Sequence, residues 1–267
     1  MTTKANKLSY QTLKLDYDSV LATITLTRAE KRNAISALMI TDLLLALDHV
    51  EASAAQVLIL TGSGKAFCAG MDLDGLRAIA SQSPDQHVED SRRMARMFYR
   101  IYSFPKPVIT AVNGAAIAGG CGIATLGDFT LAVPDAKFGY TEVRIGFVPA
   151  LVSVFLRRQI GEKRARDLLL SGRIIEAAEA FNLGLVTEIV PTEKLLARAR
   201  EIAAVLNAAS PTSITRTKRL LLSYDQAAIE AELELAVREN AGIRATADFR
   251  EGVTSFLEKR DPKWTGH

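Results

Sequence analysis

Two glycine-rich segments have residue types suited to holding an oxyanion with main-chain amides. Residues 61–73 read TGSGKAFCAGMDL and residues 113–124 read NGAAIAGGCGIA, and each follows a short run of mainly apolar residues. Glycine lets the backbone approach a ligand closely and adopt positive φ. Free amides at the start of a helix also carry a partial positive charge. The segments therefore predict backbone stabilisation of negative charge, although glycine turns that only permit close packing are the commoner case.

Other common catalytic schemes find little support in the sequence. The three histidines, His49, His87 and His267, lie in distant and unrelated surroundings. They favour neither a histidine-based triad nor a zinc site. The GSGK run at residues 62–65 lacks the spacing of a phosphate-binding loop, and Ala66 stands where a magnesium-binding hydroxyl belongs. No metal site is therefore expected.

The pattern of apolar residues predicts that both segments follow buried strands of an α/β fold. Short apolar runs alternate with glycine turns and helical patterns, which is typical of largely buried strands. The expected strands cover residues 12–17, 20–26, 57–61, 108–112, 129–133 and 185–190. The expected helices cover residues 36–51, 84–103 and a small-residue segment starting at 119 or 120.

The C-terminal part reads as helices alone. From about residue 193 the pattern is helical, with breaks at Ser210-Pro211 and near Gly242. We therefore divide the chain into a core, residues 1–204, and a C-terminal helical region, residues 205–267. No low-complexity linker separates them, so the two parts are expected to pack together.

The composition is that of an ordinary soluble globular protein, with 48% hydrophobic residues, 24% charged residues and a net charge of +3. Such a weak positive balance gives no reason to expect nucleic-acid binding. Residues 1–17 contain no apolar run of the kind that a signal peptide needs. Residues 108–127 are uncharged, but their many glycines and Asn113 make membrane insertion unfavourable. A soluble cytoplasmic protein is the expectation.

Several segments, taken in order, resemble the crotonase superfamily of enoyl-CoA hydratases and isomerases. AFCAGMDL at 66–73 and NGAAIAGGC at 113–121 look like its two signature turns, and FGYTEVRIGFVP at 138–149 resembles its acid/base region. Weaker matches in the family's order lie at Arg28, 31–35, 171–173, 180–186 and 256–260. The resemblance covers most of the chain. It implies a spiral of ββα units with a C-terminal helical trimerisation region, assembling as a homotrimer or as a hexamer (a dimer of trimers).

The resemblance also implies the catalytic groups. The family's oxyanion hole corresponds to the backbone amides of Met71 and Gly119, and its acid/base carboxylate to Glu142. Such amides hold the thioester oxygen while charge develops on it, and each is worth about 3–4 kcal/mol of barrier. The family's hydratases have a second glutamate, which corresponds here to Gly122. One carboxylate suits a proton shuttle, whereas hydration also needs a positioned water.

CoA is expected as part of the substrate, with no separate cofactor. By resemblance, Lys31 and Arg32 lie at its nucleotide end, although exposed basic residues without a ligand are an equally good interpretation. The remaining contacts implied for CoA are Ala69, Asp72 and Leu73 along the adenine and pantetheine path, and Phe256 and Lys259 reaching the CoA of a neighbouring subunit.

The expected activity is the addition of water to a 2-enoyl-CoA thioester. Residues 141–158 resemble bacterial hydratase-like sequences, some of them assigned to methylglutaconyl-CoA. The PALVS run at 149–153 departs from the family's P-G-x-G-G, so Leu151 and Val152 are expected to reshape the acyl pocket. Because of Gly122, a Δ3,Δ2-enoyl-CoA isomerase is one alternative. A non-catalytic acyl-CoA-binding or RNA-binding homologue is another.

Overall fold

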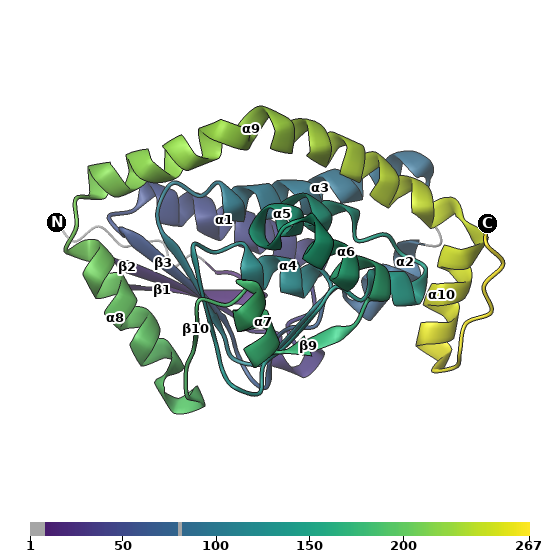
Figure 1. The fold of residues 1–267 in the computed structure, drawn as a ribbon, viewed down its shortest axis with the longest axis horizontal. Helices are drawn as coiled ribbons and strands as arrows, with labels where there is room; N and C mark the ends of the chain where they lie inside the picture. The colour runs from purple at the N-terminus through teal and green to yellow at the C-terminus, as the bar shows by residue number, and fades with distance from the viewer. Residues whose placement is uncertain (1–8, 80–81) are drawn as a thin grey trace.

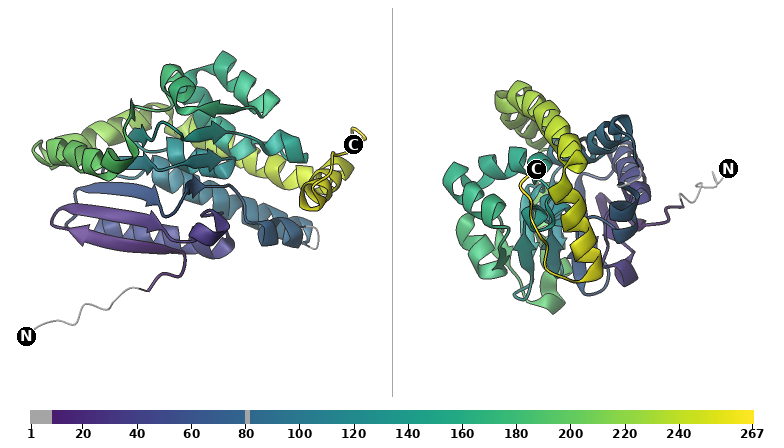
Figure 2. Two further views of the ribbon diagram at one scale, coloured as in Figure 1. Left: turned by 90° about the horizontal axis from the view of Figure 1, so that it is seen from below. Right: turned by 90° about the vertical axis from the view of Figure 1, so that its right-hand side faces the viewer.

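Two β-sheets form the centre of the molecule (Figures 1 and 2). The computed structural model describes residues 9–79 and 82–267; residues 1–8, part of the segment expected to lack a signal peptide, lie outside the described residues. The first sheet has the order β1-β2-β3-β5-β7-β10 and the second β4-β6-β8-β9. The strands of the first sheet are β1 (Leu13–Asp18), β2 (Leu21–Leu26), β3 (Val57–Gly62), β5 (Val108–Val112), β7 (Phe129–Ala132) and β10 (Glu188–Ile189). Those of the second are β4 (Ala66–Cys68), β6 (Ala115–Ile117), β8 (Lys137–Gly139) and β9 (Ile174–Glu176).

Strand β5 shows why the centre of the first sheet is parallel and apolar. All of its residues are buried, and it pairs in parallel with β3 on one side and β7 on the other. Its polar residue Thr110 is tolerated because the hydroxyl donates a hydrogen bond to the carbonyl of Ala124 at 2.6 Å. Parallel strands of this kind need covering elements, and α4 and α8 both contact β5.

Three consecutive units each give one strand to each sheet. The pairs β3–β4, β5–β6 and β7–β8 start in the first sheet and end in the second. A helical segment follows each pair: α2 (Leu73–Ile79), α4 (Gly119–Thr125) and the 3-10 helix η2 (Glu142–Ile145). This repetition agrees with the expected spiral of ββα units. Because β4 and β6 are parallel neighbours, their carboxyl ends lie at the same edge of the second sheet.

The predicted elements of the first sheet are largely confirmed, and the second sheet was not predicted. The strand expected at 185–190 is shorter, because the amides of Leu185 and Val186 donate to the carbonyl of Ala180 at the end of α7. The helices are α1 (Ala37–Ala52), α3 (Pro84–Tyr102), α5 (Ala150–Ile160), α6 (Glu162–Ser171), α7 (Ala177–Leu183), α8 (Leu195–Asn207), α9 (Pro211–Gly242) and α10 (Ala247–Glu258), with 3-10 helices η1 (Ala29–Lys31), η3 (Thr192–Lys194) and η4 (Ile243–Ala245).

The C-terminal helices run along one side of the core and continue beyond it. Helix α9 lies alongside α3 and α5, and α10 lies at the opposite end of the molecule from α8 (Figures 1 and 2). The boundary placed at residues 204/205 falls inside α8, and the break between α8 and α9 lies at 208–210. Within the described residues no helix is both long and apolar enough to cross a membrane, and residues 108–127 form β5, β6 and α4.

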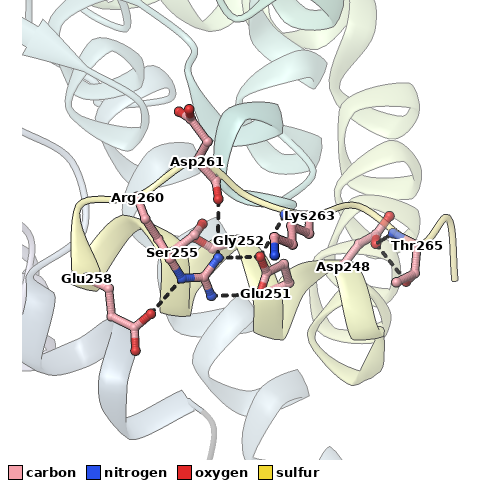
Figure 3. Close-up of polar contacts among 9 residues, drawn as sticks. All are labelled: Asp248, Glu251, Gly252, Ser255, Glu258, Arg260, Asp261, Lys263 and Thr265. Carbon is pink, nitrogen blue, oxygen red and sulfur yellow. Dashed lines mark hydrogen bonds and ion pairs between the residues drawn. The ribbon is translucent and has the colours of Figure 1, made fainter.

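The segment that follows helix α10 folds back along the helix and is joined to it by ion pairs and hydrogen bonds (Figure 3). The guanidinium of Arg260 pairs with Glu251 and Glu258, and the amide of Lys263 donates to Glu251 at 2.7 Å. The pKa of Glu251 is lowered to about 2, mainly by the hydrogen bond from Arg260. On its other side α10 packs directly on η2, since a β-carbon added to Gly252 would lie 2.3 Å from the carbonyl carbon of Ile145. The position of η2 therefore depends on α10.

Candidate active site

The amide of Met71 lies immediately beyond β4, in an extended segment beside Ile35. The Ile35 amide donates to the carbonyl of Gly70 at 2.7 Å, and the Asp72 amide donates to the carbonyl of Ile35 at 2.9 Å. Successive amides of an extended chain point to opposite sides, so the Met71 amide between these two bonds faces away from Ile35. Met71 lines a cavity. Its amide is therefore available to a ligand.

The amide of Gly119 begins α4 at the end of the neighbouring strand, β6. The turn into this helix is made by Ala118, whose φ of 51° and ψ of −127° are unusual for a residue with a side chain. The amide of Ala118 donates to the carbonyl of Gly139 at 2.7 Å, and its carbonyl accepts from Cys121 and Gly122. A first-turn amide such as that of Gly119 has no acceptor within its helix. The predicted pair, Met71 and Gly119, is thus brought to one sheet edge and one cavity.

Glu142 is the buried carboxyl group of this site. It begins η2, directly after β8 and Thr141, and only 9% of the residue is exposed. Its Oε2 atom is buried and has no hydrogen-bond partner in the described part of the chain. Burial raises the pKa of Glu142 to about 7, opposed by a hydrogen bond from its own backbone. A carboxyl that ionises near neutrality can both take up and release a proton under physiological conditions.

The cavity that joins these groups has a volume of about 200 Å³. Helices α2, α3, α5 and α10 supply much of its apolar wall through Leu76, Met94, Phe98, Leu151, Val152 and Phe256. Among the described residues, its polar side chains are Thr141, Glu142, Asn240 and Arg244. An apolar cavity with a few convergent polar groups and one perturbed carboxyl is typical of a catalytic site.

Gly122 is enclosed by other side chains. A β-carbon added there would lie 2.7 Å from Cγ1 of Val152 and 3.3 Å from Cε1 of Phe98. A contact below 3 Å would force Val152 or the backbone of α4 to move. The position that corresponds to the family's second glutamate therefore has no free volume for a side chain. Leu151 and Val152 both line the cavity, and that they shape an acyl pocket stays a prediction.

The residues predicted to bind CoA are spread between the cavity and the surface. Ala69 and Phe256 line the cavity, whereas Leu73 is 44% exposed and Lys31, Arg32 and Lys259 lie on the surface. Phe256 lines the cavity of its own chain, so contact with a neighbouring subunit remains a prediction. Nζ of Lys31 lies 3.7 Å from Oδ2 of Asp74, so these two exposed side chains form an ion pair.

Asp72 differs from the other predicted CoA residues because its carboxylate is already engaged. It accepts from Arg28 at 2.5 Å and from the amide of Asp74 at 3.0 Å. Burial raises the pKa of Asp72, but these hydrogen bonds and the charges of Arg28 and Lys31 outweigh it, so the pKa is lowered. The side chain therefore anchors the segment next to the Met71 amide.

Sequence reasoning missed Asn240 and Arg244 as residues of the cavity. They are four positions apart at the end of α9 and in η4, a spacing that places both on one helical face. That spacing was the available signal, but nothing in the sequence indicates that this face meets a cavity built by the core.

The family model for enoyl-CoA hydratase/isomerase matches residues 16–267. The chain belongs to this family. A protein of Thermus thermophilus named "Putative enoyl-CoA hydratase" is 44% identical to this chain over 245 residues, which are 91% of this chain and 97% of the relative. The "Crotonyl-CoA hydratase" of Syntrophomonas wolfei is 32% identical over 258 residues, 95% of this chain and 97% of the relative.

The fold is shared with solved structures of the enoyl-CoA hydratase/isomerase family. The crystal structure of an enoyl-CoA hydratase/isomerase from Xanthobacter autotrophicus Py2 superposes with a TM-score of 0.87 at 29% identity, covering 95% of this chain and 98% of that one. The predicted membership of the crotonase superfamily and its fold are therefore confirmed. The narrower resemblance to methylglutaconyl-CoA hydratases remains a prediction.

Proposed function

We propose that this member of the enoyl-CoA hydratase/isomerase family adds water to the double bond of a 2-enoyl-CoA thioester. Both relatives described above carry hydratase names. The observation that carries the proposal is the buried Glu142 carboxyl, with its pKa of about 7, on the wall of a cavity that Met71 and Gly119 also line.

In the proposed reaction the amides of Met71 and Gly119 donate to the thioester oxygen. Negative charge develops on that oxygen as a water oxygen bonds to Cβ, and fixed donors in a dry cavity stabilise this charge. The ionised Glu142 accepts a proton from the attacking water. The same carboxyl then donates a proton to Cα as the enolate returns to the thioester, which leaves Glu142 ionised for the next cycle.

The outer part of the substrate is proposed to follow the residues predicted for CoA. Lys31 and Arg32 are exposed cations next to the segment that carries Ala69, Asp72 and Leu73, because the amide of Ala69 donates to the carbonyl of Arg32 at 3.0 Å. Lysine and arginine are the side chains that bind phosphate best. A homotrimer, or a hexamer built as a dimer of trimers, would bring Phe256 and Lys259 near a second copy.

The decisive experiment compares the wild type with two substrates side by side. Hydration of crotonyl-CoA is followed by the loss of the enoyl-thioester absorbance, and conversion of a 3-enoyl-CoA to the 2-enoyl isomer is followed by its gain. The proposal predicts faster hydration than isomerisation. Isomerisation without hydration would favour the single-carboxylate proton shuttle instead, and turnover of neither substrate would favour a non-catalytic acyl-CoA-binding protein.

A further inference from the structure

A buried guanidinium lies in the wall of the cavity that contains Glu142. Arg244, from η4, is 4% exposed as a residue and 1% exposed in its side chain. It lines the same cavity as Met71, Gly119 and Glu142. Burial is costly for an arginine unless its donors and its charge are matched. The partners of the Arg244 guanidinium therefore indicate which kind of ligand it can bind.

The protein satisfies only part of this guanidinium. Nη2 donates to Oδ1 of Asn240 at 3.0 Å, and Nη1 lies 2.9 Å from a carboxylate oxygen of Asp90. The guanidinium carbon is 5.6 Å from the ring centre of Phe147, another cavity residue. Nε is buried without a hydrogen-bond partner among the described residues, and Nη1 meets Asp90 as an ion pair without the alignment of a hydrogen bond. Since arginine has five N–H donors, capacity remains for another acceptor.

The surroundings hold the guanidinium in place and leave one class of acceptor to be supplied. Asn240 Oδ1 accepts from Ser91 at 2.7 Å as well as from Arg244, which fixes the amide and, through it, the guanidinium. The other charged residue of the cavity wall is Glu142. Among the described residues no ion pair joins Glu142 to Arg244: Oε2 of Glu142 has no hydrogen-bond partner, and the guanidinium of Arg244 is paired with Asp90. Arg244 is therefore not the counter-ion of the catalytic carboxyl.

We propose that Arg244, oriented by Asn240, binds a carboxylate carried by the acyl group, so that the preferred substrate is the CoA monothioester of an unsaturated dicarboxylic acid. An acyl chain ending in a methyl group leaves the buried donors unpaired. A terminal carboxylate accepts from them in a charge-assisted hydrogen bond, which is worth more than a neutral one. Asp90, whose side chain is 27% exposed, balances the charge of the guanidinium when no acyl carboxylate is bound to it. The inference rests on the proposed function for the class of thioester bound.

The test measures binding with saturated thioesters, which cannot be hydrated. Glutaryl-CoA is compared with pentanoyl-CoA, and adipoyl-CoA with hexanoyl-CoA, by isothermal titration calorimetry. At one length or both, the dicarboxylic ester should bind about 10- to 100-fold more tightly than its neutral partner. Arg244→Met should bring the ratio of the two Kd values close to one. The matched control is Arg158→Met, which removes a partly buried arginine that is paired with α9 through Glu232 outside the cavity, and this variant should keep the wild-type ratio.

Equal or weaker binding of the dicarboxylic esters at both lengths overturns the inference, as does an unchanged ratio in Arg244→Met. If that variant does not fold, Asp90→Asn decides, because Asp90 competes for the guanidinium and its neutralisation should raise the ratio. A ratio that stays the same or falls in Asp90→Asn counts against the inference. Binding preference without hydration of any enoyl-CoA would overturn only the proposed function. Failure to bind either class of ester would overturn both.

Discussion

A β-carbon built on Gly122 would lie 2.7 Å from Cγ1 of Val152. The two residues are far apart in sequence and meet because α4 and α5 pack together beside the cavity. Val152 thus occupies the space into which a side chain at position 122 would extend. The absence of a side chain at position 122 and the presence of Val152 in the PALVS run are therefore linked by packing, because each residue limits the size of the other.

This arrangement predicts that a glutamate cannot simply be restored at position 122. Gly122→Glu alone should lose stability by about 1–3 kcal/mol through overpacking. Gly122→Glu combined with Val152→Ala should fold and should hydrate crotonyl-CoA at least about tenfold faster than Val152→Ala alone, since a positioned acid/base group contributes about 10²–10⁴-fold. The measurement is the initial rate for all three variants. A stable Gly122→Glu single variant with raised hydration would show that the contact is not limiting.

The raised pKa of Glu142 predicts a specific pH dependence of the reaction. Because the ionised carboxylate must accept the first proton, kcat/KM should fall below a pKa of about 7 in the free enzyme. Glu142→Gln should reduce turnover by about 10²–10⁴-fold and remove this acidic limb while CoA binding is retained. The check is a pH–rate profile of both proteins. A wild-type profile that stays flat from about pH 5 to 9 would contradict the role.

The same carboxyl makes a separate prediction about stability. Its pKa is about 7 in the folded chain and 4.5 when unperturbed, so the folded state holds the proton more tightly. Its stabilising contribution is fully present below pH 4.5 and is lost as pH rises through about 7, for a total of about 3 kcal/mol. Urea unfolding at acidic and alkaline pH should therefore show wild type losing about this much relative to Glu142→Gln. Parallel curves for the two proteins would mean that Glu142 is not desolvated.

Removal of the Gly119 amide should greatly reduce turnover without unfolding the protein. Proline lacks an N–H and is tolerated at the first position of a helix, which is where Gly119 lies. Gly119→Pro should reduce kcat by at least about 10²-fold. Ala37→Pro places the same change at the first position of α1, outside the cavity, and serves as the control. Circular dichroism establishes folding, and full activity in folded Gly119→Pro would exclude this amide from the oxyanion hole.

Helix α9 carries apolar side chains that suit an interface with other copies of the chain. Leu220, Leu221 and Tyr224 are 53%, 62% and 69% exposed. Light scattering should give the mass of three or six chains, and Leu221→Arg should shift the protein towards smaller species by burying an unpaired charge. A wild type that is monomeric and fully active would contradict both the trimer and the contact of Phe256 and Lys259 with a second subunit.

The parts of the fold that could be predicted are those whose pattern is local. Strand β5 was predicted at its observed bounds because an apolar run between a proline turn and a glycine turn has few other interpretations. The three-residue strands of the second sheet carry no period that sequence can reveal, although β4 and β6 lead directly into the two amides proposed for the oxyanion hole. The positions of Met71, Gly119 and Glu142 followed from family resemblance rather than from periodicity. The burial of Arg244 depends on packing between distant elements, so it was not predicted.

The order of the cavity residues along the chain has a consequence for biosynthesis. The two amides proposed for the oxyanion hole and Glu142 are all present once residue 142 has been made, but Asn240, Arg244 and Phe256 line the cavity from the last helices. At usual rates of translation, on the order of 10 s separates these events. During that interval the nascent chain exposes the apolar walls of an unfinished cavity. The ribosome-bound chain is therefore expected to be most dependent on chaperones after α5 has emerged and before α9 docks, and to acquire acyl-CoA binding only at the end of synthesis.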